Sequence, residues 1–138
     1  MTLAGQQSVD QAGRQPVLLV VEDDGDMLDA IATTLEDAGY GVLRAANGLE
    51  ALARLGETEG RRCDLILLDL MMPVMNGWDF RAKQRAIPAF AATPVLLMSA
   101  GAHLATVSGE LKAAGCIAKP VEMGDLLDVV KRHVGETQ

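Results

Sequence analysis

Short runs of consecutive apolar residues recur along the chain and predict its strands. The strongest are Val17–Val21, Leu65–Leu68 and Val95–Met98, which contain no polar residue. Uninterrupted runs of this length are typical of strands buried on both faces of a parallel sheet. Weaker runs at 41–45 and 116–118 predict a second and a fifth strand.

Apolar residues at helical spacing fill the stretches between and after these strands. The predicted helices lie within 28–38, 50–55, 78–86, 104–114 and 126–134. The third has only a thin apolar stripe, because Arg81, Gln84 and their neighbours are polar. The fourth is expected to run to Ala114 and to end at Gly115.

The order of the elements, a strand followed by a helix five times over, predicts an α/β fold. Such alternation gives a doubly wound parallel sheet with helices on both faces and right-handed crossovers. In these sheets a functional site lies beyond the carboxyl ends of the strands. Polar residues that come just after the apolar runs are therefore expected on one edge: Glu22, Asp23, Asp69, Ser99 and Lys119.

Composition narrows the class of protein. The chain of 138 residues is long enough for one domain with its own core, and 49% of its residues are hydrophobic. The net charge of −7 argues against a nucleic-acid-binding face, and no apolar run approaches the ~20 residues of a membrane span. Residues 1–16 lack the apolar core of a signal peptide. We therefore expect a flexible tail at 1–16, a domain at 17–134, a short tail at 135–138 and a cytoplasmic location.

The sulfur-containing residues are predicted to be structural. Cys63 and Cys116 show no metal-ligand spacing. In the predicted sheet they fall on non-adjacent strands, ~10 Å apart, which is too far for a disulfide. We expect both to be reduced packing residues, and we expect Met71, Met72 and Met75 to pack in the core as well.

The polar residues of the predicted edge have a chemistry in common. Three carboxylates, Glu22, Asp23 and Asp69, form an oxygen-rich set suited to a hard cation such as Mg²⁺. Lys119 and Ser99 add an ammonium and a hydroxyl, which are the groups needed to hold a phosphoryl group. A carboxylate can itself be the nucleophile and give an aspartyl phosphate.

Four motifs together resemble the receiver domain of two-component response regulators. They are Val20-Val21-Glu22-Asp23-Asp24, Leu67-Leu68-Asp69-Leu70-Met71-Met72-Pro73 with Asn76-Gly77, Met98-Ser99-Ala100 and Lys119-Pro120. They occur in the family's order, which makes the match specific. The resemblance covers about 17–134, and it implies a flavodoxin-like sheet with strand order 2-1-3-4-5 and five helices.

The resemblance also implies a Mg²⁺ site. Asp23 and Asp69 would bind the ion directly, and the backbone carbonyl of Met71 would be a third protein ligand. Glu22 would act directly or through water. No other cofactor is implied.

The same resemblance assigns roles in signalling. Asp69 would accept a phosphoryl group from a phosphohistidine on a histidine kinase or phosphotransfer protein. Lys119 would contact that phosphoryl group, and Ser99 would move toward it. The signal would reach a downstream target through the face formed by the fourth helix, the fifth strand and the fifth helix. Catalysis would be limited to the domain's own phosphorylation and dephosphorylation.

Two residues depart from the family pattern. Many members carry an aromatic switch residue three positions before the Lys, where this chain has Cys116. The Phe that is common after Lys-Pro is Val121 here. The site is complete, but the aromatic rotamer change that often reports phosphorylation is not available to this chain.

Structural roles compete with the functional ones at several positions. Asp24 and Asp26 are expected to cap the first helix, where carboxylates favour the positive end of the dipole. Asp69 paired with Lys119 as a purely structural ion pair would leave Glu22 and Asp23 unexplained. A Ser directly after a strand is often a turn residue, so this alternative stays open for Ser99.

Two other functions remain as alternatives. One is a pseudo-receiver, a binding module that is never phosphorylated, and the missing aromatic residue at Cys116 is its main support. The other is a metal-dependent phosphatase with Asp69 as nucleophile. Phosphatases of that kind usually carry a second Asp two residues later, where this chain has Met71, so this alternative is disfavoured.

Overall fold

The protein forms a parallel sheet of five strands in the order β2-β1-β3-β4-β5. The computed structural model describes residues 15–57, 63–72, 74–101 and 104–134. The strands are β1 (Val17–Val21), β2 (Gly41–Ala45), β3 (Leu65–Asp69), β4 (Val95–Ser99) and β5 (Gly115–Ala118). This strand order and the parallel pairing confirm the fold class predicted from the sequence.

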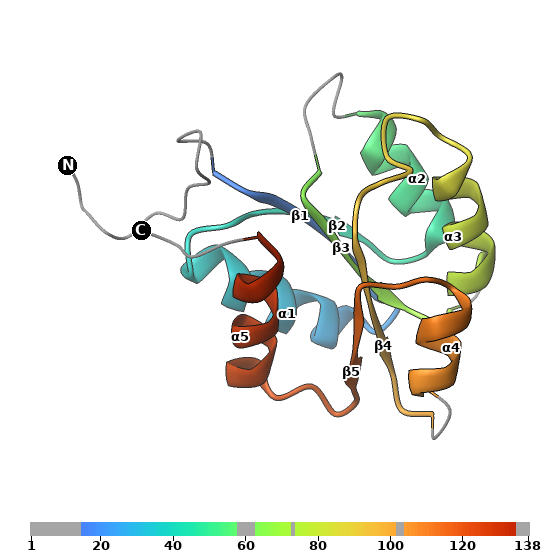
Figure 1. Ribbon diagram of the computed structural model, residues 1–138. Coiled ribbons are helices and arrows are strands. Elements are labelled where there is room, and N and C mark those ends of the chain that lie inside the picture. The colour runs from blue at the N-terminus through green and yellow to red at the C-terminus, as the bar shows by residue number, and fades with distance from the viewer. Residues whose placement is uncertain (1–14, 58–62, 73, 102–103, 135–138) are drawn as a thin grey trace.

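Helices cover both faces of the sheet (Figure 1). They are α1 (Gly25–Asp37), α2 (Gly48–Gly56), α3 (Gly77–Arg85), α4 (Leu104–Glu110) and α5 (Met123–Val134). Figure 1 shows α1 and α5 on one face and α2, α3 and α4 on the other. Within the described residues, none of these helices is long and apolar enough to cross a membrane.

The central strands explain why the long apolar runs are uninterrupted. Every residue of β3 and β4 is buried, as is every residue of β1 after its first. Alternate side chains enter two separate cores: Leu19, Ile66 and Leu97 face α2, α3 and α4, whereas Leu18, Leu67 and their neighbours face α1 and α5. Burial on both faces removes the need for polar positions along these strands.

Three helices begin at side-chain caps close to the carboxyl end of a strand. Asp24 accepts a hydrogen bond from the backbone N–H of Met27 at the start of α1, as the capping interpretation of that residue predicts. Asn47 and Asn76 cap α2 and α3 in the same way. Caps at these positions fix where the chain turns away from the sheet edge.

The predicted end of the fourth helix is wrong. α4 ends at Glu110, and Gly115 is the first residue of β5 rather than a helix stop. Between them Lys112 takes a positive φ of 55°, and the backbone carbonyls of Leu111 and Lys112 accept hydrogen bonds from the Arg81 side chain. The carbonyls just beyond the helix are thus bonded to the Arg81 side chain rather than to a further helical turn.

Arg81 and Gln84 of α3 are buried, so the inward face of this helix is wider than the thin apolar stripe expected from the sequence. Arg81 Nη1 donates to Gln84 Oε1 at 2.7 Å. Gln84 Nε2 in turn donates to the carbonyls of Phe90, at 2.7 Å, and Thr93, at 3.1 Å. Polar side chains are tolerated in a core when their hydrogen bonds are satisfied in this way.

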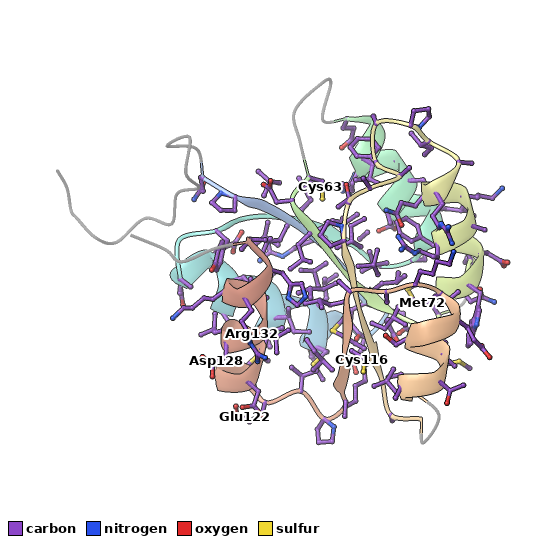
Figure 2. All side chains as sticks on the ribbon, viewed as in Figure 1. Cys63, Met72, Cys116, Glu122, Asp128 and Arg132 are labelled. Atoms are coloured by element: carbon purple, nitrogen blue, oxygen red, sulfur yellow. The ribbon has the colours of Figure 1, made fainter. Side chains whose placement is uncertain are left out.

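Two sulfur side chains are exposed where packing was expected. Cys63 is buried and Cys116 is exposed, and both are free thiols that lie well apart (Figure 2). Met72 and Met75 are buried as predicted, whereas Met71 is 67% exposed. Cys116 escapes burial because β5 is an edge strand, and Met71 escapes it because it lies in the loop beyond β3.

The expected tails lie largely outside the described residues. The described residues begin at Gln15 and end at Val134. Gln15 and Pro16 already contact the domain: Gln15 Nε2 donates to the carbonyl of Gly39 at 2.6 Å, and the carbonyl of Pro16 accepts from the N–H of Gly41 at 2.9 Å.

Gly77, the first residue of α3, allows a close approach of two backbone segments. A Cβ at this position would lie 2.9 Å from the Cα of Leu70 and 3.1 Å from the carbonyl oxygen of Asp69. Gly77→Ala is therefore expected to lower the free energy of unfolding by roughly 1–3 kcal/mol in urea titrations. Gly109→Ala is the matched control, because a Cβ there meets nothing within 4 Å. Equal stability changes for the two variants would contradict this account.

Candidate phosphoryl and metal site

The carboxyl ends of four strands place the predicted site residues around one cavity. Glu22 and Asp23 follow β1, Asp69 ends β3, Ser99 ends β4 and Lys119 follows β5. All five side chains line a cavity of about 800 Å³. The structure thus brings together every side chain that the sequence placed on this edge.

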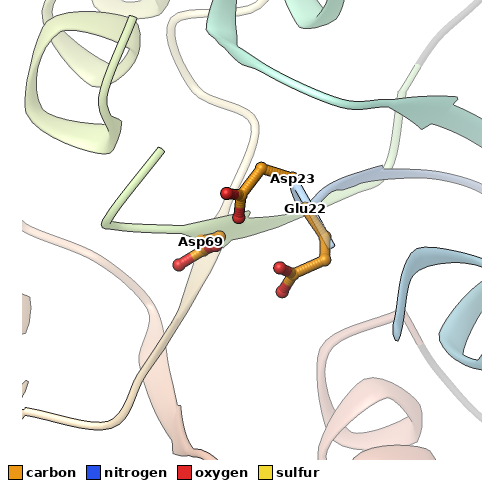
Figure 3. Close-up of side chains that lie close together, drawn as sticks. All are labelled: Glu22, Asp23 and Asp69. Atoms are coloured by element: carbon orange, nitrogen blue, oxygen red, sulfur yellow. The ribbon is translucent and has the colours of Figure 1, made fainter. Parts of the chain in front are cut away.

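The three carboxylates form a compact cluster (Figure 3). One oxygen from each of Glu22, Asp23 and Asp69 lies within 4.8 Å of the other two. Glu22 is fully buried and Asp69 is 2% exposed, whereas Asp23 is open to solvent. Two of the three charges are therefore held almost entirely out of bulk water.

Lys119 provides the cation that faces this cluster. Its Nζ lies 2.8 Å from Glu22 Oε1 and 3.3 Å from Asp69 Oδ2. The contact with Glu22 Oε1 is an ion pair without good hydrogen-bond angles, since no hydrogen bond reaches that oxygen among the described residues. The Lys119–Pro120 peptide bond is cis, and the backbone N–H of Lys119 donates to the carbonyl of Ser99 at 3.0 Å.

The surroundings of Asp69 disfavour its ionised form. Burial raises the pKa of this carboxyl from 3.8 to about 7, with further contributions from a hydrogen bond with Asp23 and the charge of Glu22. The charge of Lys119 and the backbone N–H of Met71, which donates to Oδ1 at 3.1 Å, act in the opposite direction. One ammonium does not compensate the buried negative charge.

Lys119 responds in the opposite sense. Burial alone would lower the pKa of its ammonium, but the close contact with Glu22 and the charges of Asp69 and Glu22 outweigh burial and raise that pKa. The ammonium therefore stays protonated at neutral pH and remains available to an anionic ligand.

The donor set fits a hard divalent cation. Its three carboxylates supply only oxygen ligands, and no sulfur or imidazole joins the cluster among the described residues. Oxygen ligands of this kind suit Mg²⁺, which commonly keeps several waters and binds one or two carboxylates. The charge balance points the same way, because three carboxylates face a single ammonium.

Ser99 has a turn contact in this structure. Its Oγ accepts a hydrogen bond from the backbone N–H of Gly101 at 3.2 Å. This is the turn role that competes with a phosphoryl contact. The hydroxyl hydrogen is still free to donate, and Ser99 lines the same cavity as Asp69, so both roles remain compatible with the geometry.

Several apolar residues of the cavity were not predicted from the sequence. They are Leu104 and Val107 of α4, which line the cavity together with Trp78 of α3, a residue expected beside the site loop. The helical spacing of Leu104 and Val107 indicated only a buried helix face. Their place beside Asp69 depends on how α4 packs, which local spacing does not encode.

Comparisons with known proteins agree with this geometry. The family model described as the response regulator receiver domain matches residues 18–131. The transcriptional regulatory protein CpxR homolog of Haemophilus influenzae is 37% identical over 116 residues, which are 83% of this chain and 48% of that protein. Protein PilG of Pseudomonas aeruginosa is 29% identical over 119 residues, 85% of this chain and 86% of that protein.

A solved structure shows the same fold. The chemotaxis response regulator CheY4 of Vibrio cholerae superposes with a TM-score of 0.77 and 32% identity, covering 86% of this chain and 98% of that one. The chain spans about half the length of the first curated relatives that it matches. The similarity therefore concerns a domain that several of those relatives carry beside another part.

The raised pKa of Asp69 predicts how stability depends on pH without metal. The folded state binds this proton more tightly than the unfolded state, so the contribution of Asp69 to stability is highest below pH ~4 and is lost as the pH rises toward about 7. In EDTA at pH 7.5, Asp69→Asn should raise the free energy of unfolding by about 1–3 kcal/mol.

The same substitution should flatten the pH dependence of stability between pH 4 and 7, as measured by urea titration at several pH values. Asp128→Asn, at an exposed position of α5, is the control and should change stability by less than ~0.5 kcal/mol. A metal-free Asp69→Asn protein that is less stable than wild type at pH 7.5 would refute this electrostatic account.

Proposed function

The chain belongs to the response regulator receiver family, and we propose that it is a phosphorylatable receiver domain with Asp69 as the acceptor. The phosphoryl donor would be a phosphohistidine on a histidine kinase or phosphotransfer protein. The observation that carries this proposal is the buried Asp69 carboxylate beside an acidic cluster, with the Lys119 ammonium 3.3 Å from its Oδ2. An acceptor at Asp69 would thus have its positioning groups on the same edge of the sheet.

The residues for a Mg²⁺ site are those of the acidic cluster. Asp23 and Asp69 would bind the ion directly, the Met71 carbonyl would be a third protein ligand, and Glu22 would act directly or through water. The ion would neutralise negative charge between the acceptor and the phosphoryl oxygens. Support for this assignment comes from the fit of the oxygen ligands to a hard cation.

The transfer step requires little covalent chemistry from the protein. A carboxylate oxygen of Asp69 attacks phosphorus, a P–O bond forms and the P–N bond to the donor histidine breaks. The electron pair of that bond remains on the imidazole nitrogen, which is then protonated. Lys119 Nζ would pair with one phosphoryl oxygen and Ser99 Oγ–H would donate to another. Both groups act by positioning and by neutralising charge.

The signal would end when the aspartyl phosphate is hydrolysed. Water attacks phosphorus, the P–O bond to Asp69 breaks, and inorganic phosphate leaves while the carboxylate is regenerated. Asp23 and Glu22 keep the site polar enough for water to enter, since Asp23 is open to solvent. The domain is catalytic only toward its own phosphoryl group under this proposal.

The partners follow from the same proposal. A histidine kinase or phosphotransfer protein would dock over the strand edge that carries Asp69. A downstream protein would bind the face formed by α4, β5 and α5, in the cytoplasm. The similar proteins are named for transcriptional regulation and chemotaxis, and neither output is assigned to this chain.

The first test is covalent labelling. Incubation with acetyl phosphate and Mg²⁺, followed by intact mass, should add the mass of one phosphate to wild type and none to Asp69→Asn. Addition of EDTA before the donor should prevent labelling. Asp79→Asn, an exposed carboxylate on α3, should label like wild type.

The outcome also separates the alternatives. A wild-type protein that stays unmodified while a known receiver is labelled in parallel would favour the pseudo-receiver. Multiple turnover of a small phosphate ester such as p-nitrophenyl phosphate would favour the phosphatase.

Metal binding has its own readout, independent of phosphorylation. Mg²⁺ at about 100 times its dissociation constant should stabilise the fold by ~2.7 kcal/mol, seen as a rise in Tm that EDTA reverses. Asp23→Asn should weaken this stabilisation strongly, whereas Asp26→Asn, in the first turn of α1, should retain it. The absence of any Mg²⁺-dependent rise in wild type would argue against the metal site.

A further inference from the structure

The cavity beside Asp69 has the size of a pocket for a small organic molecule. Its volume is about 800 Å³, and pockets that hold small organic ligands commonly measure roughly 300–1,000 Å³. A metal ion and a phosphoryl group would both be held by the oxygens of the acidic cluster and by Lys119. Neither of them needs an apolar surface, so the apolar part of the cavity has a different use.

Three apolar side chains from two helices form this part of the lining. The charged residues of the cavity lie at the ends of strands or directly after them, whereas Trp78 lies on α3 and Leu104 and Val107 lie on α4. Figure 1 shows both helices on the same face of the sheet. We call Trp78, Leu104 and Val107 the apolar wall. An apolar wall beside a few convergent polar groups is the usual composition of a ligand pocket.

The apolar wall still has surface to offer to a ligand. Trp78 is 37% exposed and Val107 is half-buried, whereas Leu104 is buried and supports them from behind the cavity surface. Covering the free part of an indole removes apolar surface from water. A second aromatic ring placed against it adds the attraction of an aromatic pair. The wall therefore favours a planar, apolar group.

The geometry of phosphoryl transfer directs the leaving group into the rest of the cavity. The attacking and leaving oxygens lie roughly in line on opposite sides of phosphorus. Asp69 is 2% exposed and lines the cavity, so a donor molecule reaches its carboxylate through that cavity. With Asp69 on one side of phosphorus, the leaving group extends from the other side and shares the cavity with the apolar wall.

We propose that the cavity accepts small acyl phosphates whole and that the apolar wall binds their acyl group, so aromatic acyl phosphates are better donors than acetyl phosphate. This inference rests on the proposed function of Asp69. A carboxylate oxygen of Asp69 attacks phosphorus, and the P–O bond to the acyl group breaks. The electron pair of that bond leaves with the acyl group as a free carboxylate, so no further reactant is needed.

Benzoyl phosphate and acetyl phosphate are the two probes, because both release a carboxylate and they differ in the acyl group. Labelling with each donor is followed by intact mass, in Mg²⁺ and at low donor concentration, which gives a second-order rate constant. The ratio of the benzoyl to the acetyl rate constant should be about tenfold in wild type. Asp69→Asn should be labelled by neither donor.

Matched variants show whether the apolar wall causes this preference. Trp78→Ala should lower the ratio about fivefold, because benzoyl phosphate loses a ring contact that the acetyl group is too small to make. Trp78→Phe keeps an aromatic ring and should retain most of the ratio. Leu49→Ala removes another exposed apolar side chain, on α2 and outside the cavity lining, and should keep the wild-type ratio. Val107→Ala replaces Trp78→Ala if the latter does not fold by circular dichroism.

Binding to the wall can also be measured without phosphoryl transfer. Benzylphosphonate and methylphosphonate contain a P–C bond and do not transfer their phosphoryl group. Trp78 is the single tryptophan of the chain, so its fluorescence reports a ligand beside it. With Mg²⁺ present, benzylphosphonate should change this fluorescence at a concentration about tenfold lower than methylphosphonate.

The results separate this inference from the proposed function. A wild type that both donors label, with the same ratio in Trp78→Ala, overturns the inference and leaves the receiver function standing. An equal fall of the ratio in Leu49→Ala also overturns it, because the effect would then not depend on the wall. A wild type that neither donor labels overturns the proposed function, and the inference about donors falls with it.

Discussion

The burial of two carboxylates beside a single ammonium is the constraint on which this strand edge depends. Glu22 and Asp69 are almost completely removed from water, and Lys119 contacts both. A buried charge costs several kcal/mol unless it is paired and hydrogen-bonded. One cation shared by two buried anions, with Asp23 close by, leaves the site short of positive charge. The raised pKa of Asp69 expresses that deficit.

Strand register determines which charged and polar side chains meet at this edge of the sheet. Val21 lies opposite Leu68 in the β1–β3 pair, so the residues that follow them, Glu22 and Asp69, lie side by side at the carboxyl ends of the two strands. Asp69 pairs with Met98, one residue before Ser99, and Ser99 pairs with Ala118, one residue before Lys119. A slip of one residue in any pair would turn a side chain to the other face. The hydrophobic core, by fixing the register, also fixes the charged site.

This dependence explains what the sequence could predict. The apolar runs determine the strands, parallel alternation places their ends on one edge, and the site residues then follow from position alone. The early end of α4 could not be found this way, because it depends on Arg81 reaching carbonyls 30 and 31 residues away in the chain. The polar residues on α3 left only a thin apolar stripe in the sequence, whereas the fold buries Arg81 and Gln84 and satisfies their hydrogen bonds internally. Exposure of Cys116 and Met71 likewise depends on an edge strand and a loop.

The apolar wall that Leu104 and Val107 give the cavity was missed for a related reason. Helical spacing showed that Leu104 and Val107 face inward, but it did not show that the space before them is left partly unfilled. Packing density is a property of all the surrounding elements, and α4 packs on β4 and β5, while Arg81 bonds the carbonyls just beyond it. A cavity of this kind is therefore visible only when the helices are placed together.

The lack of positive charge at the site would also affect Ser99. A phosphoryl group adds negative charge where the site already has too much, so Lys119 would have to divide its contacts among Glu22, Asp69 and the new oxygens. Neutral hydrogen-bond donors near Asp69 would then be needed to bond the phosphoryl oxygens. Ser99 lines the cavity, and its hydroxyl hydrogen is free to donate. Ser99 Oγ already accepts a hydrogen bond from the N–H of Gly101. A contact between Ser99 and a phosphoryl oxygen on Asp69 would therefore also act on the turn that follows β4.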